Sequence, residues 1–264
     1  MRFIVIASRR DPAGMNIVEN INKLSKEIKT KIVRSEIINA ENIDKDPEVA
    51  TYDFIIFASK HQSEKKVKTL SVHTIGNFET AKFGGKSRTI CSSNPLFFKH
   101  IFQNLNNNLK KSELDFTLSL EATHHGPYIE KPSLFIEIGS SLKEWSDIRA
   151  GKLIAETIIE SINNFSNYNL RYKLSIGIGG PHYCPNFNEI QLGDEYAIAH
   201  IIPSYNLPID DSILKETLRK SVIPVSHVLI DWKGLGNSIQ RNELLKLLEN
   251  NGLTIIRTSD AKTN

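Results

Sequence analysis

Three histidines in two short turn sequences have the residue types and spacing of a chemical site. His124 and His125 precede Gly126-Pro127, and His182 follows Gly179-Gly180-Pro181. An imidazole can act as a general base, a general acid or a metal ligand near neutral pH. Because two of the histidines are adjacent and the third lies in a similar turn, we expect them to form one hydrolytic site.

The adjacent pair His124-His125 raises the question of which ring does the chemistry. Neighbouring side chains of an extended backbone point to opposite sides. We therefore expect one of the two rings to face the site directly, with His182 as its partner. The other ring would pack against the fold or reach the site from the turn. The sequence leaves open which ring takes which place.

Two glutamates and a pair of glycines could complete such a site. Glu137 lies in an apolar segment, where a carboxylate is costly unless it is paired. We predict that it orients a histidine or binds a metal. Glu121 has a similar setting, but a structural ion pair explains it equally well. The backbone amides of Gly179 and Gly180 could bind an oxyanion, because glycine lets a substrate approach closely.

The absence of known nucleophile and cofactor motifs, together with the candidate metal ligands, limits the reactions that the site could catalyse. The chain has no Gly-x-Ser-x-Gly elbow, no Walker loop and no dinucleotide fingerprint. We therefore expect no nucleotide cofactor and predict water as the nucleophile. Candidate zinc ligands are His124, His125, His182 and Glu137, with His61 and His73 as weaker candidates. No tight ligand spacing supports a metal, so metal-free acid–base catalysis stays open.

The composition is that of an ordinary globular protein with a mildly basic balance. Hydrophobic residues make up 40% and charged residues 24% of the 264 residues, and the formal net charge is +3. This balance permits a nucleic-acid partner without requiring one. The lysines that we predict to contact such a partner are Lys60, Lys82, Lys86 and Lys233.

The first residues and the two cysteines indicate the compartment. Residues 1–8 are mostly apolar and are followed by Arg9-Arg10, the reverse of the charge order in a signal peptide. No apolar run approaches the roughly 20 residues that span a bilayer. We expect a cytoplasmic protein without a membrane partner, in which Cys91 and Cys184 are free thiols.

Short apolar segments and amphipathic segments alternate along the chain. The predicted strands are 3–7, 54–58, 116–120, 134–138, 174–178, 197–202 and 227–230, with 32–38 as a weaker candidate. The predicted helices are 15–29, 97–109, 150–161, 211–221 and 238–250, the last with Ser238 as its N-cap. This order predicts an α/β fold with a mainly parallel, twisted sheet and helices on both faces.

We expect residues 1–264 to form a single α/β domain. The one long stretch without a clear pattern is 60–90, which we interpret as a loop or hairpin over the site. Five of the predicted strands run into His, Glu, Asp, Lys or Gly residues. Ligands of open parallel sheets bind beyond the carboxyl ends of the strands, so this convergence predicts one site at that edge.

Several of these motifs, taken in order, resemble the archaeal and plant type of D-aminoacyl-tRNA deacylase. The resemblance rests on Ala58-Ser59-Lys60-His61, His73, Gly76-Asn77, Gly84-Gly85, Thr123-His124-His125-Gly126-Pro127, Glu137-Ile138-Gly139-Ser140, Trp145, Gly177-Ile178-Gly179-Gly180-Pro181-His182-Tyr183 and Asp231-Trp232-Lys233-Gly234-Leu235. Together they cover nearly the whole chain, and their combination is specific. Cys184 departs from the pattern, since a small residue such as Ala is expected there.

The resemblance implies hydrolysis of the ester between a D-amino acid and the terminal adenosine of tRNA, with zinc as the associated metal. It also implies a fold similar to the peptidyl-tRNA hydrolase and phosphorylase group. His124 or His125 would then be the base or a metal ligand with His182 as its partner, and Glu137 would orient one of them or hold the substrate amine. The four lysines would contact phosphates of the acceptor stem of tRNA. We expect a monomeric chain.

Two other functions stay open at this point. One is another zinc-dependent hydrolase on the same fold, although a phosphorylase is disfavoured because no arginine lies in these motifs. The other is a non-catalytic tRNA-binding protein. That function would explain the lysines but would not need the three histidines together.

Overall fold

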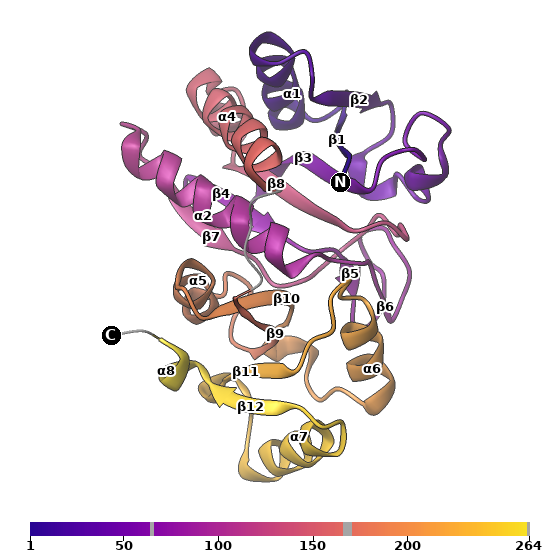
Figure 1. Ribbon diagram of the computed structural model, residues 1–264, viewed down its shortest axis with the longest axis vertical. Helices are drawn as coiled ribbons and strands as arrows, with labels where there is room; N and C mark the ends of the chain where they lie inside the picture. The colour runs from indigo at the N-terminus through magenta and orange to yellow at the C-terminus, as the bar shows by residue number, and fades with distance from the viewer. Residues whose placement is uncertain (64–65, 166–170, 263–264) are drawn as a thin grey trace.

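The strands form two separate sheets, which lie one above the other in Figure 1. The computed structural model describes residues 1–63, 66–165 and 171–262. The first sheet has six strands in the order β2-β1-β3-β8-β4-β7, and the second has four in the order β10-β9-β11-β12. A small hairpin of β5 (Gly76–Asn77) and β6 (Thr89–Ile90) stands apart from both sheets.

The remaining strands are short and mostly buried. The six-stranded sheet contains β1 (Phe3–Ser8), β2 (Lys29–Val33), β3 (Phe54–Gln62), β4 (Thr69–His73), β7 (Thr117–Leu120) and β8 (Ser133–Ser140). The four-stranded sheet contains β9 (Lys173–Gly179), β10 (Tyr196–Ile202), β11 (His227–Asp231) and β12 (Thr254–Arg257). All pairs in both sheets are parallel except β4 with β8. The predicted mainly parallel α/β fold is therefore confirmed.

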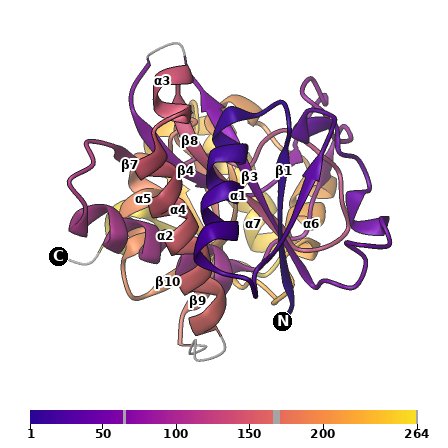
Figure 2. The same cartoon turned by 90° about the horizontal axis from the view of Figure 1, so that it is seen from above.

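Helices cover the two sheets differently. The helices are α1 (Pro12–Leu24), α2 (Pro95–Lys111), α3 (Leu142–Trp145), α4 (Ile148–Asn164), α5 (Pro185–Leu192), α6 (Asp211–Arg219), α7 (Ser238–Asn250) and α8 (Thr258–Ala261). On the six-stranded sheet, α4 lies between α1 and α2 over one face (Figures 1 and 2). On the four-stranded sheet, α6 and α7 cover one face, and α2, α5 and α8 pack near the other.

The face of the six-stranded sheet away from α1, α2 and α4 has a different character. It carries a smaller apolar cluster that includes Ile6, Phe57 and Phe135. The polar residues Glu137 and His73 lie on this same face, since the His73 ring stacks on Phe135 with 5.0 Å between ring centroids. Helices thus cover both faces of the four-stranded sheet. The face of the six-stranded sheet away from α1, α2 and α4 instead carries the polar side chains of Glu137 and His73.

The segment 60–90 contains a strand that the sequence did not indicate. Strand β4 lies inside the sheet, between β8 and β7. Its five residues alternate, with Leu70 and Val72 directed to the main core and Ser71 and His73 to the other face. So short an alternating stretch is a weak strand signal. The same segment also contains the β5–β6 hairpin. Residues 64 and 65 lie outside the described residues.

Three smaller expectations were wrong. The parallel strands are divided between two sheets, so their carboxyl ends do not share one edge. The weak strand 32–38 is not continuous, because β2 ends at Val33 and a 3₁₀ helix begins at Ile37. The N-cap of α7 is Asn237 instead of Ser238, and Asn237 forms a reciprocal capping box with Gln240.

Within the described part of the chain, no helix combines the length and the apolar composition needed to cross a membrane.

Candidate active site

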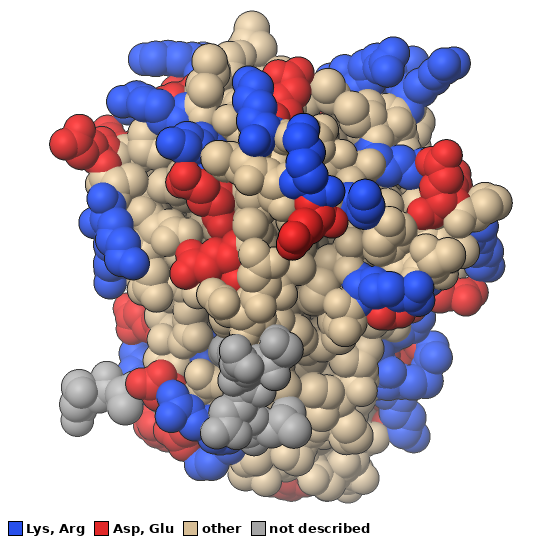
Figure 3. All heavy atoms as spheres, turned by 45° about the horizontal axis from the view of Figure 1, so that its top comes forward, with Lys and Arg blue, Asp and Glu red and all other residues tan. Residues whose placement is uncertain are grey.

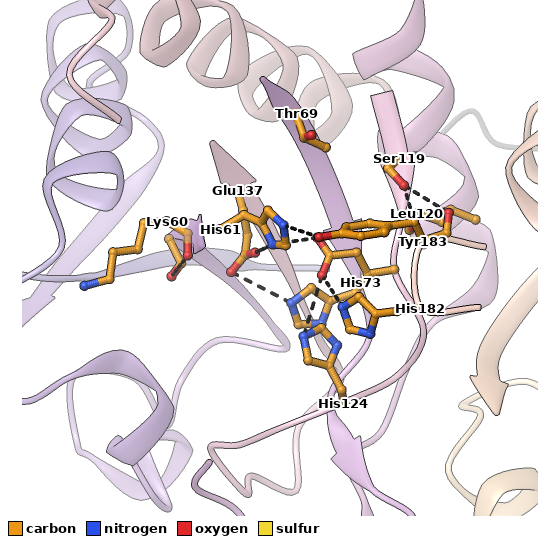
Figure 4. Close-up of polar contacts among 12 residues, drawn as sticks. Lys60, His61, Thr69, His73, Ser119, Leu120, His124, Glu137, His182 and Tyr183 are labelled. Atoms are coloured by element: carbon orange, nitrogen blue, oxygen red, sulfur yellow. Dashed lines mark hydrogen bonds and ion pairs between the residues drawn. The ribbon is translucent and has the colours of Figure 1, made fainter. Parts of the chain in front are cut away.

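Three neighbouring strands of the six-stranded sheet place His61, Glu137 and His73 on one face. Ser59 of β3 and Ser71 of β4 both pair with Glu137 of β8. Because side chains alternate along a strand, residues two positions further on point to the same side. His61 and His73 are those residues, and Figure 4 shows them converging with Glu137. The reversal of direction between β8 and β4 therefore assembles a site on a sheet face.

The turn after β7 brings both adjacent histidines to this face. His124 forms an isolated β-bridge with Ile75, and the amide of Gly76 points at the carbonyls of His124 and His125. The backbone of His125 is left-handed, with φ of 43°. This turn brings both rings beside His73, at centroid distances of 4.1 Å and 4.9 Å. His125 therefore reaches the site from the turn, which is one of the two places that we expected for the second ring of the pair.

Glu121 lies close to three histidines, His61, His124 and His182. Its side chain is fully buried, and its Oε1 and Oε2 lie 3.1 Å from His61 Nδ1 and 2.9 Å from His182 Nε2. Nε2 of His124 is 3.7 Å from the same Oε2. Burial alone would raise the pKa of Glu121, but hydrogen bonds from His182 and His61 hold that pKa well below its usual value. Sequence reasoning left this residue undecided, although a carboxylate three residues before the histidine pair was the available signal.

His61 carries the positive charge that balances the buried carboxylates. Its Nδ1 lies 3.1 Å from Glu121 and 3.6 Å from Glu137. Burial opposes protonation, yet the two carboxylates raise the pKa of His61 to about 11. Its Nε2 lies 3.1 Å from the hydroxyl of Tyr183 (Figure 4). We therefore assign His61 as an imidazolium at neutral pH that fixes both glutamates in place.

His73, His124 and His125 have the arrangement of metal ligands. Their Nδ1 atoms lie 3.1, 2.7 and 2.6 Å from the carbonyl oxygens of Thr74, Ala122 and Gly126. If each Nδ1–H donates to its carbonyl, each Nε2 keeps a free lone pair. Ligand nitrogens of the three side chains lie within 4.8 Å of one another.

The burial and the pKa shifts of His73, His124 and His125 also fit an arrangement of metal ligands. Burial lowers the pKa of His125 to about 4 and holds the pKa of His124 well below its usual value, so both are neutral donors. For His73 burial acts in the same direction, but Glu137 raises its pKa. Nε2 of His73 is buried and has no hydrogen-bond partner among the described residues, and its distance to Glu137 is 3.8 Å. A buried nitrogen without a partner is costly, and a cation would remove that cost.

His182 stands at the opening of the cluster. Its Nε2 meets Glu121, and its Nδ1 lies 3.0 Å from the hydroxyl of Tyr205. The amide of Ala122 donates to the carbonyl of His182 at 2.8 Å, which ties the turn after β9 to the turn after β7. Sequence reasoning missed Tyr205, because it lies in a 3₁₀ helix after β10 that carries no chemical motif.

A pocket of about 470 Å³ opens onto these rings. Its lining is Gly76, Asn77, Phe78, Glu79, Thr80, Lys82, Phe83, Thr123, His124, His125, His182, Tyr205 and Asn206. A larger hollow of about 760 Å³ lies between the ends of α1, α2 and α4 and is lined without any histidine. On the face that these helices form, basic and acidic side chains are interspersed (Figure 3). The chemistry therefore belongs to the pocket beside the β5–β6 hairpin.

The other predicted site residues lie in several places. Among the described residues that line the pocket, neither Gly179 nor Gly180 occurs, and both pack against Asp231. Lys82 lines the pocket. Lys60 points away from the histidines (Figure 4), Lys86 lies over the ring of Tyr128, and Lys233 lines a separate hollow beside Trp232.

Cys184 follows His182 closely but is not placed as a nucleophile. The side chain is buried, and its Sγ faces the carbonyl oxygens of Pro181 and His182 at 3.5 and 3.2 Å. Burial raises the pKa of this thiol well above its usual value. A protonated, enclosed thiol packs as a small apolar group.

Comparison with known proteins identifies the relatives of this chain. The family model described as D-aminoacyl-tRNA deacylase matches residues 48–256. The chain belongs to this family. A D-aminoacyl-tRNA deacylase of Methanocaldococcus jannaschii is 34% identical, and the match covers 96% of this chain and 98% of that relative. One of Pyrococcus furiosus is 33% identical, over 96% of this chain and 99% of the relative.

A solved structure supports the fold of this deacylase-family chain. The crystal structure of the conserved protein of unknown function AF0625 has a TM-score of 0.90 and is 28% identical, covering 99% of this chain and 96% of that chain. The family membership predicted from the motifs is confirmed, and the comparisons give no support to a different zinc hydrolase or a non-catalytic RNA-binding protein. The likeness to the phosphorylase group stays a prediction.

Proposed function

We propose that this protein hydrolyses the ester bond between a D-amino acid and the 3′ end of tRNA, acting on mischarged tRNA in the cytoplasm. Its relatives carry the name D-aminoacyl-tRNA deacylase. The observation that carries the proposal is the cluster of His182, Glu121 and three further histidines, in which His124, His125 and His182 line one pocket. An aminoacyl ester is already activated, so a positioned water and a base suffice to cleave it.

The pair His182–Glu121 is proposed to supply the base. With Nε2–H directed to the carboxylate, Nδ1 of His182 has its lone pair free and faces the hydroxyl of Tyr205. A water beside Nδ1 can give up its proton there as its oxygen attacks the ester carbonyl. The same nitrogen can return the proton to the departing ribose oxygen. Glu121 stays ionised, since it stabilises the imidazolium that forms.

Zinc is proposed as the cofactor, held by His73, His124 and His125. The free Nε2 lone pairs, the neutral state of His124 and His125 and the unpartnered nitrogen of His73 support this choice. Three histidines with one open position are typical of a catalytic zinc site. A zinc ion there would supply Lewis-acid polarisation of the ester carbonyl. Oε1 of Glu137 lies 3.8 Å from the same Nε2 of His73, so its negative charge would lie beside the bound ion.

The comparison that tests the proposal uses both enantiomers of one substrate. Purified protein should release D-tyrosine from D-tyrosyl-tRNA faster than it releases L-tyrosine from L-tyrosyl-tRNA. His182→Ala should lower the turnover of the D-substrate by a factor of at least about 100, because it removes the base. Equal rates for the two enantiomers would refute the function, and a near-normal rate in the variant would refute the role of His182.

Lys82 is the basic residue best placed to contact tRNA phosphates, since it lines the pocket. Lys82→Ala should weaken tRNA binding and reduce the slope of log K against log salt concentration by about 1. The control is Lys215→Ala, because Lys215 is paired with Asp211 on α6 at 2.7 Å. Contacts of Lys60, Lys86 and Lys233 with tRNA stay predictions, as does the monomeric state. Equal binding by both variants would exclude a contact with Lys82.

A further inference from the structure

Phe83 is a large apolar side chain that the fold leaves in water at the edge of the histidine pocket. Its exposed fraction is 67%. It shares the pocket lining with His125, His182 and Lys82. Single exposed apolar residues are common on protein surfaces and need no explanation by themselves. An exposed ring that lines a polar pocket has a potential partner in whatever enters that pocket.

The position of Phe83 is fixed by the backbone around it. Its carbonyl oxygen accepts a hydrogen bond from the amide of Gly126 at 3.0 Å, directly beside His125. The next residue, Gly84, has φ of 70°, and an added Cβ there would lie 1.8 Å from a backbone carbonyl oxygen. The amide of Gly85 donates to Oε1 of Glu41 at 2.6 Å. The ring is therefore held next to the histidine turn by a tightly packed loop.

The charge beside Phe83 indicates which part of the substrate lies there. The neighbouring residue in the chain is Lys82, which lines the same pocket; Glu79 is the acidic residue of that lining and stands four positions from Phe83 in the chain. An aminoacyl ester carries a cationic amine, which a lysine repels. The nucleotides next to the ester carry phosphates, which a lysine attracts. An aromatic ring beside a cation is also the usual surface for unpaired bases, because every base has a π-face.

We propose that Phe83 is the stacking platform for an unpaired base at the 3′ end of tRNA, with Lys82 at the adjoining phosphate. The inference rests on the proposed function, because it assumes an RNA-linked ester in this pocket. It assigns the β5–β6 hairpin to the nucleotide half of the substrate. The cationic amine and the side chain of the amino acid then lie away from Lys82.

A first experiment measures binding of the trinucleotide CCA, which has no ester and needs no catalysis. Phe83→Ala and Phe83→Leu should each weaken CCA binding about tenfold, whereas Phe83→Trp should bind at least as tightly as the unaltered protein. The control is Ile239→Ala, since Ile239 is also 67% exposed but lies on α7 outside the pocket lining. Equal CCA binding by all variants, or binding preserved in Phe83→Leu, would overturn stacking.

A second experiment separates the two halves of the substrate. With D-tyrosyl-tRNA, Phe83→Ala should raise KM about tenfold at unchanged kcat, because stacking is the same in ground and transition states. With D-tyrosine ethyl ester, which has no base, the same variant should keep its kcat/KM. An equal loss on both esters would place Phe83 at the amino acid and refute the inference. Failure of the unaltered protein to cleave D-tyrosyl-tRNA would refute the proposed function, while CCA binding would still decide the role of Phe83.

Discussion

Nε2 of His182 lies 2.9 Å from Oε2 of Glu121, and this contact joins a turn of the four-stranded sheet to a turn of the six-stranded sheet. The two residues are 61 positions apart in the chain. A second bond, from the amide of Ala122 to the carbonyl of His182, runs beside it. The proposed base is therefore oriented by a carboxylate that belongs to the other sheet.

Glu121→Gln should lower kcat for D-tyrosyl-tRNA about 100-fold while the protein stays folded. His61 and His182 face different oxygens of Glu121. The amide replaces one of these oxygens with an NH₂ donor, so it cannot accept at both places, and it does not stabilise an imidazolium. Rates of the purified variant at saturating substrate give the measurement. The control is Glu144→Gln, because Glu144 of α3 is also buried but accepts a hydrogen bond from Ser141. A similar loss in the control would point to general destabilisation.

Removal of metal should abolish hydrolysis, and added zinc should restore it. His73→Ala should bind less zinc than the unaltered protein, as measured by elemental analysis after dialysis, because one of three ligands is gone. The matched control is His227→Ala, since His227 lies at the start of β11 and bonds to Ser226. Activity that persists after confirmed loss of metal would exclude a catalytic zinc. Unchanged zinc content in His73→Ala would exclude this ligand set.

Tyr205→Phe should lower kcat about tenfold and leave KM nearly unchanged. The hydroxyl that faces Nδ1 of His182 at 3.0 Å disappears, but the aromatic ring that lines the pocket remains. One hydrogen bond that orients a reacting ring contributes about 1.4 kcal/mol, which is a factor of ten in rate. Steady-state kinetics with D-tyrosyl-tRNA separate the two parameters. A rise in KM at constant kcat would instead make Tyr205 a substrate contact.

The sequence predicted much of the site, because histidine pairs and glycine-proline turns are local features. His124, His125 and His182 lie side by side, and Glu137 lies against His61 and His73 on the same sheet face. His73 was ranked as a weak metal candidate, although it is one of the three histidines whose ligand nitrogens lie within 4.8 Å of one another. Its strand alternates between two buried faces and is only five residues long, so no local pattern separates it from a loop.

The roles of the other site residues depend on contacts between segments that are far apart in the sequence, and no local sequence pattern predicts such contacts. Glu121 gained its role from His61 and His182, which arrive from β3 and from the turn after β9. Both histidines of the adjacent pair face the site only because His125 adopts a left-handed backbone. The division of the strands into two sheets likewise follows from long-range packing. Sequence patterns predicted the components of the site, and tertiary contacts determined their roles.

A buried lysine outside the active site should make stability depend on pH. Lys99 of α2 is fully buried, and its Nζ donates to the carbonyl oxygens of Gln191 and Gly193 at 2.7 and 2.5 Å, at the end of α5. Burial lowers the pKa of Lys99 to about 7. In the unfolded chain the same amine keeps its ordinary pKa of about 10.4. Between these values the unfolded chain binds a proton that the folded protein has lost.

The free energy of unfolding should therefore rise with pH above pH 7, with a contribution from Lys99 that approaches about 1.4 kcal/mol per pH unit. Urea unfolding from pH 7 to pH 9 measures this slope. Lys99→Met should remove the contribution, whereas Lys110→Met, at an exposed lysine of the same helix, should keep it. If the unaltered protein and Lys99→Met gave parallel curves, the folded protein would hold its proton on Lys99 well above pH 7, and the desolvation argument would fail.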